Sequence, residues 1–267
     1  MDSIINFTDK LSYFSTKLIK KIEKKFGITL YYFFPLRLFL RIFEVISFKK
    51  LNDNFVEFSN YYLPIKILNK KEILVISGGI GLDIQFEKLI LKKIDISKMI
   101  LFDPTELTIN LKDEFNSNKV LYFKKALYSE SRKMKIYKPF EKKDNPNLSL
   151  DNVYTDKSKY EIIKTVGILA VLRYAKFRKY TYQLFKFDIE GVADMVIIKC
   201  LNNDFLPSVI NFELERPTSI FSQLNYFKRL FNLKKILKKN YNTFYYTNIK
   251  LGYRLELVAV KKNSNLI

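Results

Sequence analysis

The sequence predicts a doubly wound α/β domain with a mainly parallel sheet, and three features lead to this prediction. Short apolar runs rich in β-branched and aromatic residues alternate with stretches of helical periodicity. The runs lack strict polar alternation, which is typical of strands that helices bury on both faces. Near the end of the chain, a long helical stretch precedes two further strand-like runs. These runs predict an antiparallel pair that closes the C-terminal edge of the sheet.

Each predicted strand is a run of six or seven residues in the middle of the chain. The runs are EILVIS (72–77), KMILFD (98–103), VLYFKKA (120–126), LFKFDI (184–189) and VINFEL (209–214). Residues 84–94 have apolar side chains at helical spacing and suit the crossover between the first two strands. A polar stretch, residues 141–160, interrupts the rhythm and predicts a surface excursion near a site. We expect a helix over 219–239, then strands in YNTFYYTN and YRLELVAVKK.

The first 70 residues predict a separate, basic and helical segment, so we divide the chain into 1–70 and 71–267. Two helices are expected, one over residues 11–26 and one after Pro35. They could cap the main domain, cover an acceptor pocket, or anchor the protein on a membrane surface. The apolar stretch 28–48 contains two arginines and a glutamate. Central charges cost about 2.5–3.5 kcal/mol each on insertion scales, so we do not expect a spanning helix.

The absence of histidine among the 267 residues removes the most common general base and several site classes. Histidine-containing nucleophile triads and the usual zinc ligands are excluded, and no other metal-ligand spacing is visible. The single cysteine, Cys200, excludes an internal disulfide framework and suits a reducing compartment. The opening MDSIINFTDK lacks the features of a secretory signal. We therefore expect a cytoplasmic protein, with peripheral contact to the inner face of a membrane as the alternative.

The formal net charge of +20 favours anionic partners such as nucleic acid, anionic lipid or acidic glycans. A codon bias toward lysine, asparagine and isoleucine would produce the same excess without any partner. The charge is concentrated at the two ends, with +6 in residues 1–70 and +9 in residues 217–267. The basic surface therefore lies mainly outside the predicted sheet, and it constrains partners only weakly.

A glycine-rich turn follows the first predicted strand, in the segment Ser77–Gly78–Gly79–Ile80–Gly81. Glycines at a strand-to-helix turn let the backbone approach a ligand and adopt positive φ, and Asp83 can cap the next helix. The spacing differs from G-x-G-x-x-G, so a nicotinamide cofactor is not favoured. Asp103 ends the second strand, where a carboxylate can accept hydrogen bonds from ribose, although with Pro104 it could simply begin a turn. Together the two features indicate an adenosine-containing ligand.

The fourth predicted strand carries polar residues at its carboxyl end, where open α/β sheets bind ligands. Lys186, Asp188 and Glu190 alternate with apolar residues before Gly191. Burying these charges is costly unless they pair or act. A structural interpretation pairs the lysine with a glutamate and places Glu190 at a helix N-terminus. The functional interpretation is favoured because the segment follows the other two motifs in order, and Glu215 on the fifth strand is a further candidate.

In content and order, the segments GGIGLDIQFE, LFDPT, KKALYSES, LFKFDIEG and NFELE resemble the FkbM family of methyltransferases. The resemblance covers about residues 71–217 and depends most on FDIEG, since the glycine turn is generic. It departs from the family two residues after Gly191, where Ala193 stands in place of an acid. The resemblance implies a Rossmann-like class I methyltransferase domain that binds S-adenosyl-L-methionine and O-methylates a sugar or another hydroxyl acceptor.

The resemblance also implies roles for individual residues. The glycine turn would line the methionine end of the cofactor, Asp103 its ribose, and Ala126 and Leu127 its adenine, while the FDIEG acids would face the reacting methyl. The candidate cofactor-binding residues are Ser77, Gly78, Gly79, Gly81, Asp83, Asp103, Pro104, Ala126 and Leu127. The candidate catalytic residues are Lys186, Asp188, Glu190 and Glu215, one of the acids serving as base.

Two other functions stay open at the level of the sequence. The net charge would suit a nucleic-acid methyltransferase, although no recognisable nucleic-acid-binding module accompanies the domain. The N-terminal segment would suit a non-catalytic, membrane-associated protein on a degenerate methyltransferase scaffold. If the protein is an enzyme, we expect a small-molecule or glycan acceptor. This acceptor would be acidic or lipid-linked if the positive net charge reflects its partners.

Overall fold

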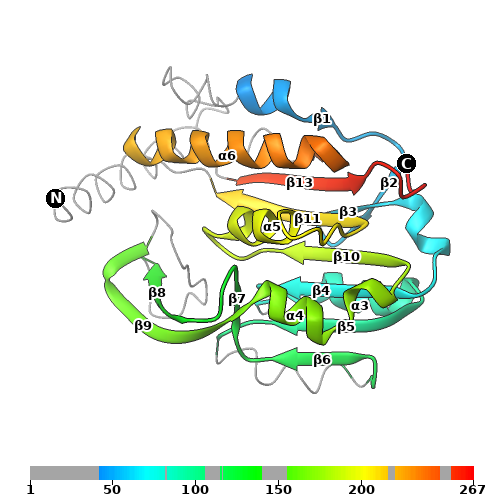
Figure 1. Cartoon of the computed structure of the whole chain (residues 1–267), viewed down its shortest axis with the longest axis horizontal. Coiled ribbons are helices and arrows are strands. Elements are labelled where there is room, and N and C mark those ends of the chain that lie inside the picture. The colour runs from blue at the N-terminus through cyan, green and yellow to red at the C-terminus, as the bar shows by residue number, and fades with distance from the viewer. Residues whose placement is uncertain are drawn as a thin grey trace, which may run out of the picture.

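The computed structural model describes residues 42–81, 83–105, 115, 117–139, 155–215, 220–246 and 254–267. Its centre is an eight-stranded sheet with the order β1-β12-β13-β11-β10-β4-β5-β6 (Figure 1). The five predicted strands are confirmed as β4 (Ile73–Gly78), β5 (Ile96–Phe102), β6 (Val120–Phe123), β10 (Tyr182–Phe187) and β11 (Val209–Glu215). The two late strands are confirmed as β12 (Tyr241–Tyr245) and β13 (Arg254–Lys261).

Strand directions agree with the prediction of a mainly parallel sheet. β4 pairs in parallel with β5 and β10, and β10 pairs in parallel with β11. β13 runs antiparallel to both β11 and β12, so the C-terminal edge reverses direction. The structure is therefore a Rossmann-like α/β domain with an antiparallel C-terminal edge, as predicted.

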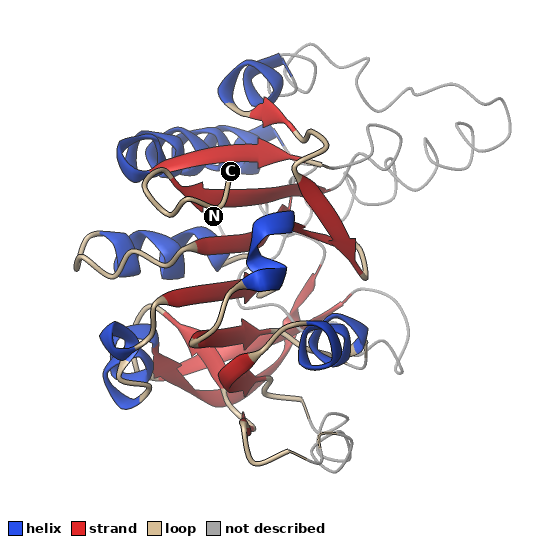
Figure 2. Cartoon of the chain, turned by 90° about the vertical axis from the view of Figure 1, so that its right-hand side faces the viewer, coloured by secondary structure: helices blue, strands red, loops and turns tan. Residues whose placement is uncertain are grey.

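Helices cover both faces of the sheet, which Figure 2 shows edge-on. One face packs against α4 (Ile168–Tyr174), α5 (Ala193–Leu201) and α6 (Ile220–Asn240). The other face packs against α3 (Gln85–Lys93), the predicted crossover helix. Strand residues such as Leu74 and Ile76 are fully buried between these layers. Burying each such side chain contributes roughly 1.5–3 kcal/mol, so the two-sided core explains the apolar runs without alternation.

A second, three-stranded sheet of order β7-β9-β8 lies beside the main one. It consists of β7 (Ala126–Tyr128), β8 (Lys133–Pro139) and the long β9 (Thr155–Gly167). The polar stretch 141–160 was expected to be a surface excursion. Residues 141–154 lie outside the described residues, and 155–160 belong to β9. A 3-10 turn, η4 (Phe177–Lys179), follows α4 before the chain enters β10.

Residues 49–69 differ from the helical segment expected over residues 1–70. They form β1 (Lys49–Lys50), β2 (Phe55–Phe58), β3 (Tyr61–Pro64) and a 3-10 turn, η2 (Ile65–Asn69). Ser59 and Asn60 have φ values of 46° and 69°, which builds a two-residue turn between β2 and β3. The buried side chains Phe55, Phe58 and Leu63 pack this hairpin on the sheet beside α3.

The remaining part of that segment is only partly described. Residues 42–47 are helical and pack on α6, with Phe43 and Phe227 at a ring-centroid distance of 4.7 Å. The helix expected over residues 11–26 lies outside the described residues. β1 pairs with β12, so the main sheet extends into the region that we had assigned to a separate segment. Among the helices that the structure describes, none has the length and apolar character needed to cross a membrane.

Candidate active site

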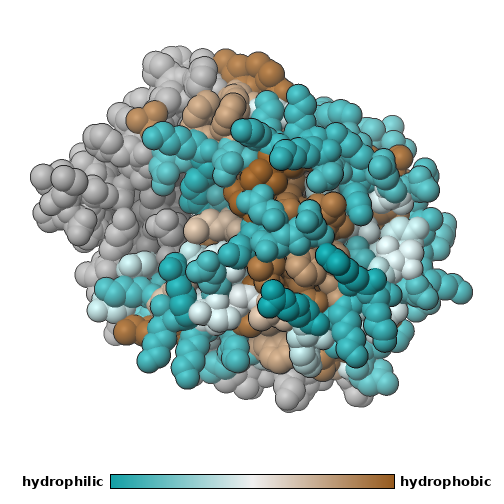
Figure 3. All heavy atoms as spheres, in the orientation of Figure 1, coloured by the Kyte–Doolittle hydropathy of each residue, from teal (hydrophilic) through white to brown (hydrophobic). Residues whose placement is uncertain are grey.

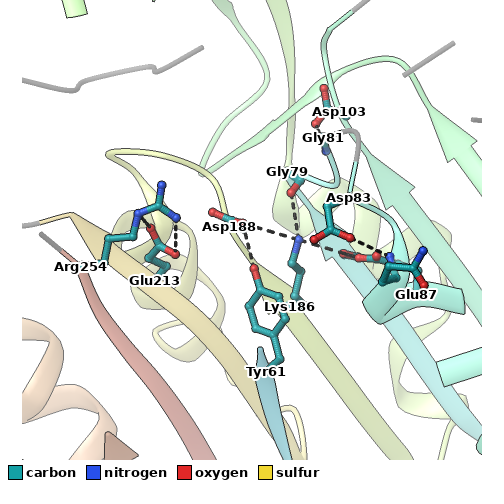
Figure 4. Close-up of polar contacts among 12 residues, drawn as sticks. Tyr61, Gly79, Gly81, Asp83, Glu87, Asp103, Lys186, Asp188, Glu213 and Arg254 are labelled. Atoms are coloured by element: carbon teal, nitrogen blue, oxygen red, sulfur yellow. Dashed lines mark hydrogen bonds and ion pairs between the residues drawn. The ribbon is translucent and has the colours of Figure 1, made fainter. Parts of the chain in front are cut away.

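A cavity of about 440 Å³ opens at the carboxyl ends of the central parallel strands. The glycine turn after β4, the end of β5 and the turn after β10 contribute to its wall, and the β2–β3 hairpin and β13 close it from the other side. Its polar lining residues are Ser59, Asn60, Tyr61, Asp83, Asp103, Thr105, Lys186, Asp188, Glu190, Glu213, Arg254 and Glu256. This is the crevice where α/β sheets bind ligands, and Figure 4 shows the polar contacts around it.

The glycine turn is held against β10 so closely that Gly79 admits no side chain. Its φ is +73°, and an added Cβ would lie 1.8 Å from the carbonyl oxygen of Asp188. Gly81 also has a positive φ, +54°, but an added Cβ would meet no atom within 4 Å. Gly79 is therefore required by packing between two strand ends, whereas Gly81 exposes its backbone to open space at the cavity wall.

Asp103 braces the glycine turn from the end of β5. Its Oδ2 accepts a hydrogen bond from the Gly81 N–H at 2.9 Å. Its Oδ1 accepts hydrogen bonds from the Thr105 N–H at 2.9 Å and the Thr105 hydroxyl at 2.6 Å. A carboxylate offers about four acceptor positions, so these bonds leave capacity for one more donor. Asp103 thus forms the turn with Pro104 and Thr105, and it also lines the cavity.

Lys186 lies at the centre of the site and is almost fully buried (Figure 4). Its Nζ donates a hydrogen bond to the carbonyl oxygen of Gly79 at 2.9 Å. It also lies 3.8 Å from Oε1 of Glu87 and 3.9 Å from Oδ2 of Asp188. Glu87, on α3, is fully buried and accepts a hydrogen bond from the Ser77 hydroxyl at 2.6 Å. The lysine therefore neutralises two acids and ties β10 to the glycine turn.

Asp188 is oriented by a tyrosine from the hairpin. The Tyr61 hydroxyl donates a hydrogen bond to Oδ2 of Asp188 at 2.8 Å. The Tyr61 ring packs edge-on against Phe86, with 5.0 Å between centroids, and Lys186 Nζ lies 5.1 Å from its centroid. Burial, followed by the charge of Asp188, raises the pKa of Tyr61 well above its ordinary value. Tyr61 therefore stays protonated and keeps its donor role at neutral pH.

The opposite end of the cavity contains a glutamate pair and one arginine. Glu213 of β11 and Glu256 of β13 are direct partners across the antiparallel ladder. Arg254 makes two contacts with Glu213, Nε to Oε1 at 2.8 Å and Nη1 to Oε2 at 3.1 Å. Burial and Asp188 raise the pKa of Glu213 well above its ordinary value, although Arg254 acts in the other direction. This end of the cavity therefore contains the Arg254–Glu213 ion pair, with Glu256 beside it on β13.

Two further acids lie near the turn after β10. Glu190 lines the cavity, whereas Glu215 does not. Oε2 of Glu215 accepts a hydrogen bond from the Gly191 N–H at 2.9 Å, and Gly191 has a φ of +81°. Burial, followed by the charge of Glu190, raises the pKa of Glu215 to about 8. Glu215 thus holds the turn that presents Glu190, rather than facing the cavity itself.

The structure brings most of the predicted site residues to one cavity. Those that line it are Gly79, Gly81, Asp83, Asp103, Pro104, Ala126, Lys186, Asp188 and Glu190. Ser77 is not in the cavity lining, and its hydroxyl donates a hydrogen bond to Glu87. Leu127 is fully buried and packs against Gly78. Asp83 accepts a hydrogen bond from the N–H of Gln85, the first residue of α3, at 3.2 Å.

Sequence reasoning missed several residues around the site, most of which come from outside the recognised segments. Tyr61 belongs to a stretch read as helical, although Ser59–Asn60 between two aromatic runs is a hairpin signal. Glu87 ends the recognised segment GGIGLDIQFE but was not among the predicted site residues. Arg254 and Glu256 lie on the last strand, and only its pairing with β11 brings them to the site.

Comparisons with known proteins give similarity at the level of the fold. No family model matches the chain, and no curated protein matches it. The FkbM methyltransferase of Methylobacillus flagellatus KT aligns with a TM-score of 0.46 and 12% identity, over 73% of this chain and 45% of that protein. This chain thus spans less than half of that FkbM protein.

Two other solved structures are similar to this chain. SMU.1697c, a candidate methyltransferase from Streptococcus mutans solved in complex with SAH, aligns with a TM-score of 0.38 and 11% identity. That alignment covers 73% of this chain and 93% of SMU.1697c. The spermidine synthase of Thermotoga maritima aligns with a TM-score of 0.37 and 16% identity, over 75% and 57% of the two chains. Because the similarity is confined to the fold, we argue the function from the cavity.

Proposed function

We propose that this protein is an S-adenosylmethionine-dependent methyltransferase that transfers the methyl group to a hydroxyl of a small molecule or glycan. One observation carries the proposal. The glycine turn, Asp103 and the Lys186–Asp188 pair, which three separate sequence segments contribute, line a single cavity at the carboxyl ends of β4, β5 and β10. This arrangement suits an adenosine-containing ligand laid across the strand ends.

The residues present fit this cofactor in shape and in charge. Gly81 leaves open space at the wall, Asp103 retains acceptor capacity for a ribose hydroxyl, and Ala126 and Ile136 offer an apolar surface for the adenine. The cofactor carries a sulfonium and an ammonium group, and the cavity lining is predominantly acidic. When bound, it supplies a methyl group already activated for transfer.

The chain's own task is then to orient the acceptor and remove its proton. Asp188 is the best-placed base, since it lines the cavity and its side chain is 28% exposed to solvent. Tyr61 and Lys186 both contact Oδ2, which fixes the carboxylate and directs proton transfer to Oδ1. Positioning of the acceptor hydroxyl in line with the methyl group supplies most of the remaining rate enhancement.

Calorimetric titration of the full chain with S-adenosylhomocysteine tests cofactor binding. We expect saturable binding that Asp103→Asn weakens about tenfold or more, because one ribose hydrogen bond and the brace on the glycine turn are lost. Asp95→Asn, just before β5, removes the same charge from an exposed residue and serves as the control. Absence of binding in the unmodified protein, or displacement by NAD⁺ at equal concentration, would overturn the proposal.

Turnover tests the assignment of the base. Asp188→Asn keeps the size of the side chain and its contact with Tyr61 but removes the negative charge. We expect loss of methyl transfer at neutral pH with S-adenosylhomocysteine binding retained. Near-normal turnover in this variant would exclude Asp188 as the base.

A nucleic-acid acceptor is the alternative that the net charge suggests. Binding of a labelled oligonucleotide with a steep salt dependence would favour this alternative.

One surface favours peripheral contact with a membrane, which we propose as an accompanying property. The helix over residues 42–47 exposes Ile42, Val45 and Ile46, the last at 77%, and hydrophobic spheres mark it at the top of Figure 3. Leu224 and Phe231 of the neighbouring, basic helix α6 are also more than half exposed. Co-sedimentation with vesicles of anionic phospholipid should exceed that with zwitterionic vesicles, and equal recovery in both would contradict this proposal.

A further inference from the structure

The turn between β2 and β3 presents two polar side chains to the cavity. Ser59 and Asn60 form this turn, and both line the cavity together with the next residue, Tyr61. Within the described part of the chain, neither the Ser59 hydroxyl nor the Asn60 carboxamide has a hydrogen-bond partner. Both groups are therefore available to a ligand.

The backbone of this turn would suit glycine better than serine. Ser59 and Asn60 both have positive φ, and hairpin turns of this kind favour Asn-Gly, Asp-Gly or Gly-Gly. Serine adopts this conformation only at a cost in strain. Strained positions cluster where a side chain has a function, so the presence of a hydroxyl here points to a role in the cavity.

Contacts on both sides hold the turn in a fixed position. The Tyr61 hydroxyl bonds Asp188 at 2.8 Å, and the Tyr61 ring lies 5.0 Å from that of Phe86. The rings of Tyr62 and Tyr246 lie 4.9 Å apart. A ligand at the turn thus meets groups that are already ordered, and ordering them on binding costs little.

The hairpin lies on the side of the cavity away from the ribose site. β3 packs against β11 and β13, which lie on one side of β10 in the sheet order. The glycine turn and Asp103 follow β4 and β5, which lie on the other side of β10. Asp188 follows β10, between the two sides. The turn is therefore placed to contact the acceptor.

The two side chains match a hydroxyl group in hydrogen-bonding chemistry. A serine hydroxyl and a carboxamide both donate and accept hydrogen bonds, as a ligand hydroxyl does. A carboxylate only accepts and an ammonium group only donates, so either would leave part of the turn unsatisfied. We propose that Ser59 and Asn60 determine acceptor specificity by binding a second hydroxyl of the acceptor, next to the one at Asp188. This inference rests on the proposed function, since it takes Asp188 as the base.

Three ligands with one ring test the chemical class on the protein saturated with S-adenosylhomocysteine. They are cyclohexane-1,2-diol as separate cis and trans isomers, cyclohexanol, and 2-hydroxycyclohexanecarboxylate, and binding is measured by ligand-observed NMR titration. We expect one diol isomer to bind about threefold to tenfold tighter than cyclohexanol, because it gains a hydrogen bond. Cyclohexanol is the more apolar ligand, so nonspecific binding would give the opposite order. The hydroxy acid should bind more weakly than that diol.

Glycine variants locate the effect without disturbing the turn. Asn60→Gly and Ser59→Gly remove the polar groups and keep positive φ accessible. Each should reduce the preference for the diol about threefold and leave S-adenosylhomocysteine affinity within about twofold. Asn265→Gly is the matched control, since Asn265 also has a positive φ, 54°, and lies outside this cavity. Asn60→Asp, which also tolerates positive φ, removes the amide donor and should reduce the preference if a glycine variant does not fold.

The outcomes separate this inference from the proposed function. Failure of S-adenosylhomocysteine to bind the unmodified protein contradicts the proposed function. With S-adenosylhomocysteine bound, the inference is overturned by equal binding of diol and cyclohexanol, by tightest binding of the hydroxy acid, or by no binding of any member. It is also overturned if the diol preference survives in the variants of both turn residues. A tenfold loss of S-adenosylhomocysteine affinity in Asn60→Gly would assign the turn to the cofactor instead. All of these results leave the methyltransferase proposal standing.

Discussion

The cavity and helix α6 are both rich in charged residues, and the excess charge has opposite signs in the two. Residues 220–240 carry six lysines and arginines and no acid, whereas the cavity has six acids and two bases. Most cations of α6 face solvent, where a charge costs little and screening weakens its partners. Asp103, Lys186 and Glu213 of the cavity are instead buried, and each contacts a polar partner. Net charge therefore describes the surface of this protein and misrepresents its site.

One cation of α6 shows how a buried partner changes the role of a charge. Arg229 of α6 turns inward, and its Nε lies 2.8 Å from Oδ2 of the buried Asp194. Its Nη2 donates a second hydrogen bond to the carbonyl oxygen of Gly191 at 2.6 Å. Asp194 follows Ala193, the position where the sequence departs from the FkbM pattern. Through these bonds, Arg229 fastens α5 and the turn after β10 to α6.

The largest effect is expected inside the cavity, at Gly79. Gly79→Ala places a Cβ 1.8 Å from a backbone oxygen that cannot move without breaking the β4–β10 pairing. We expect S-adenosylhomocysteine affinity to fall by about a hundredfold or more, with a lower free energy of unfolding. Gly81→Ala is the control for stability alone, since it meets only backbone strain and should cost about 1 kcal/mol. Equal losses of unfolding free energy in urea denaturation would contradict the close packing at Gly79.

Two lysine–glutamate pairs compare burial with exposure directly. Lys186→Met leaves Glu87 buried without its cation and should lower the free energy of unfolding by about 3–5 kcal/mol. Lys199→Met breaks the exposed pair with Glu130, at 3.3 Å, and should cost less than about 1 kcal/mol. Adding Glu87→Gln to Lys186→Met should recover part of the loss. If the two single variants differ by less than the error of urea denaturation, the buried pair has no special role.

The dependence of stability on pH should follow Glu215. Its pKa is about 8 in the folded protein against an ordinary value of 4.5, so the folded state binds more protons between these limits. The free energy of unfolding should therefore fall as pH rises from about 5 to 8, by at most about 1.4 kcal/mol per pH unit for this group. Glu215→Gln should flatten the profile in this window. A profile that is unchanged in the variant would show that Glu215 is ionised in the folded protein.

The smallest effect is expected on the basic helix. Lys228→Gln with Lys235→Gln removes two exposed charges of α6 that lie outside the cavity. Stability should change by less than about 0.5 kcal/mol, and S-adenosylhomocysteine affinity should stay the same. Elution from heparin should shift to lower salt, because surface charge governs such nonspecific binding. A marked loss of cofactor affinity would mean that surface and cavity are electrostatically coupled.

The sheet was predictable because its causes are local and repetitive. Five apolar runs, the glycine turn and Asp103 identified the strands and the edge at which a site should lie. The hairpin β2–β3 was missed because its aromatic residues also fit a helical period. The turn at Ser59 and Asn60 decides between the two, since both residues adopt positive φ there.

By itself, the sequence determined the fold class, the order of the motifs and the acids at the end of β10. Only the tertiary structure decided which residues complete the site. Tyr61 and Asp188 are 127 positions apart, and Glu213 meets Glu256 only because β13 runs back along β11. Periodicity and turn signals act over a few residues, whereas these contacts depend on strand order and register. For the same reason, the sign of the net charge could not reveal the sign of the cavity.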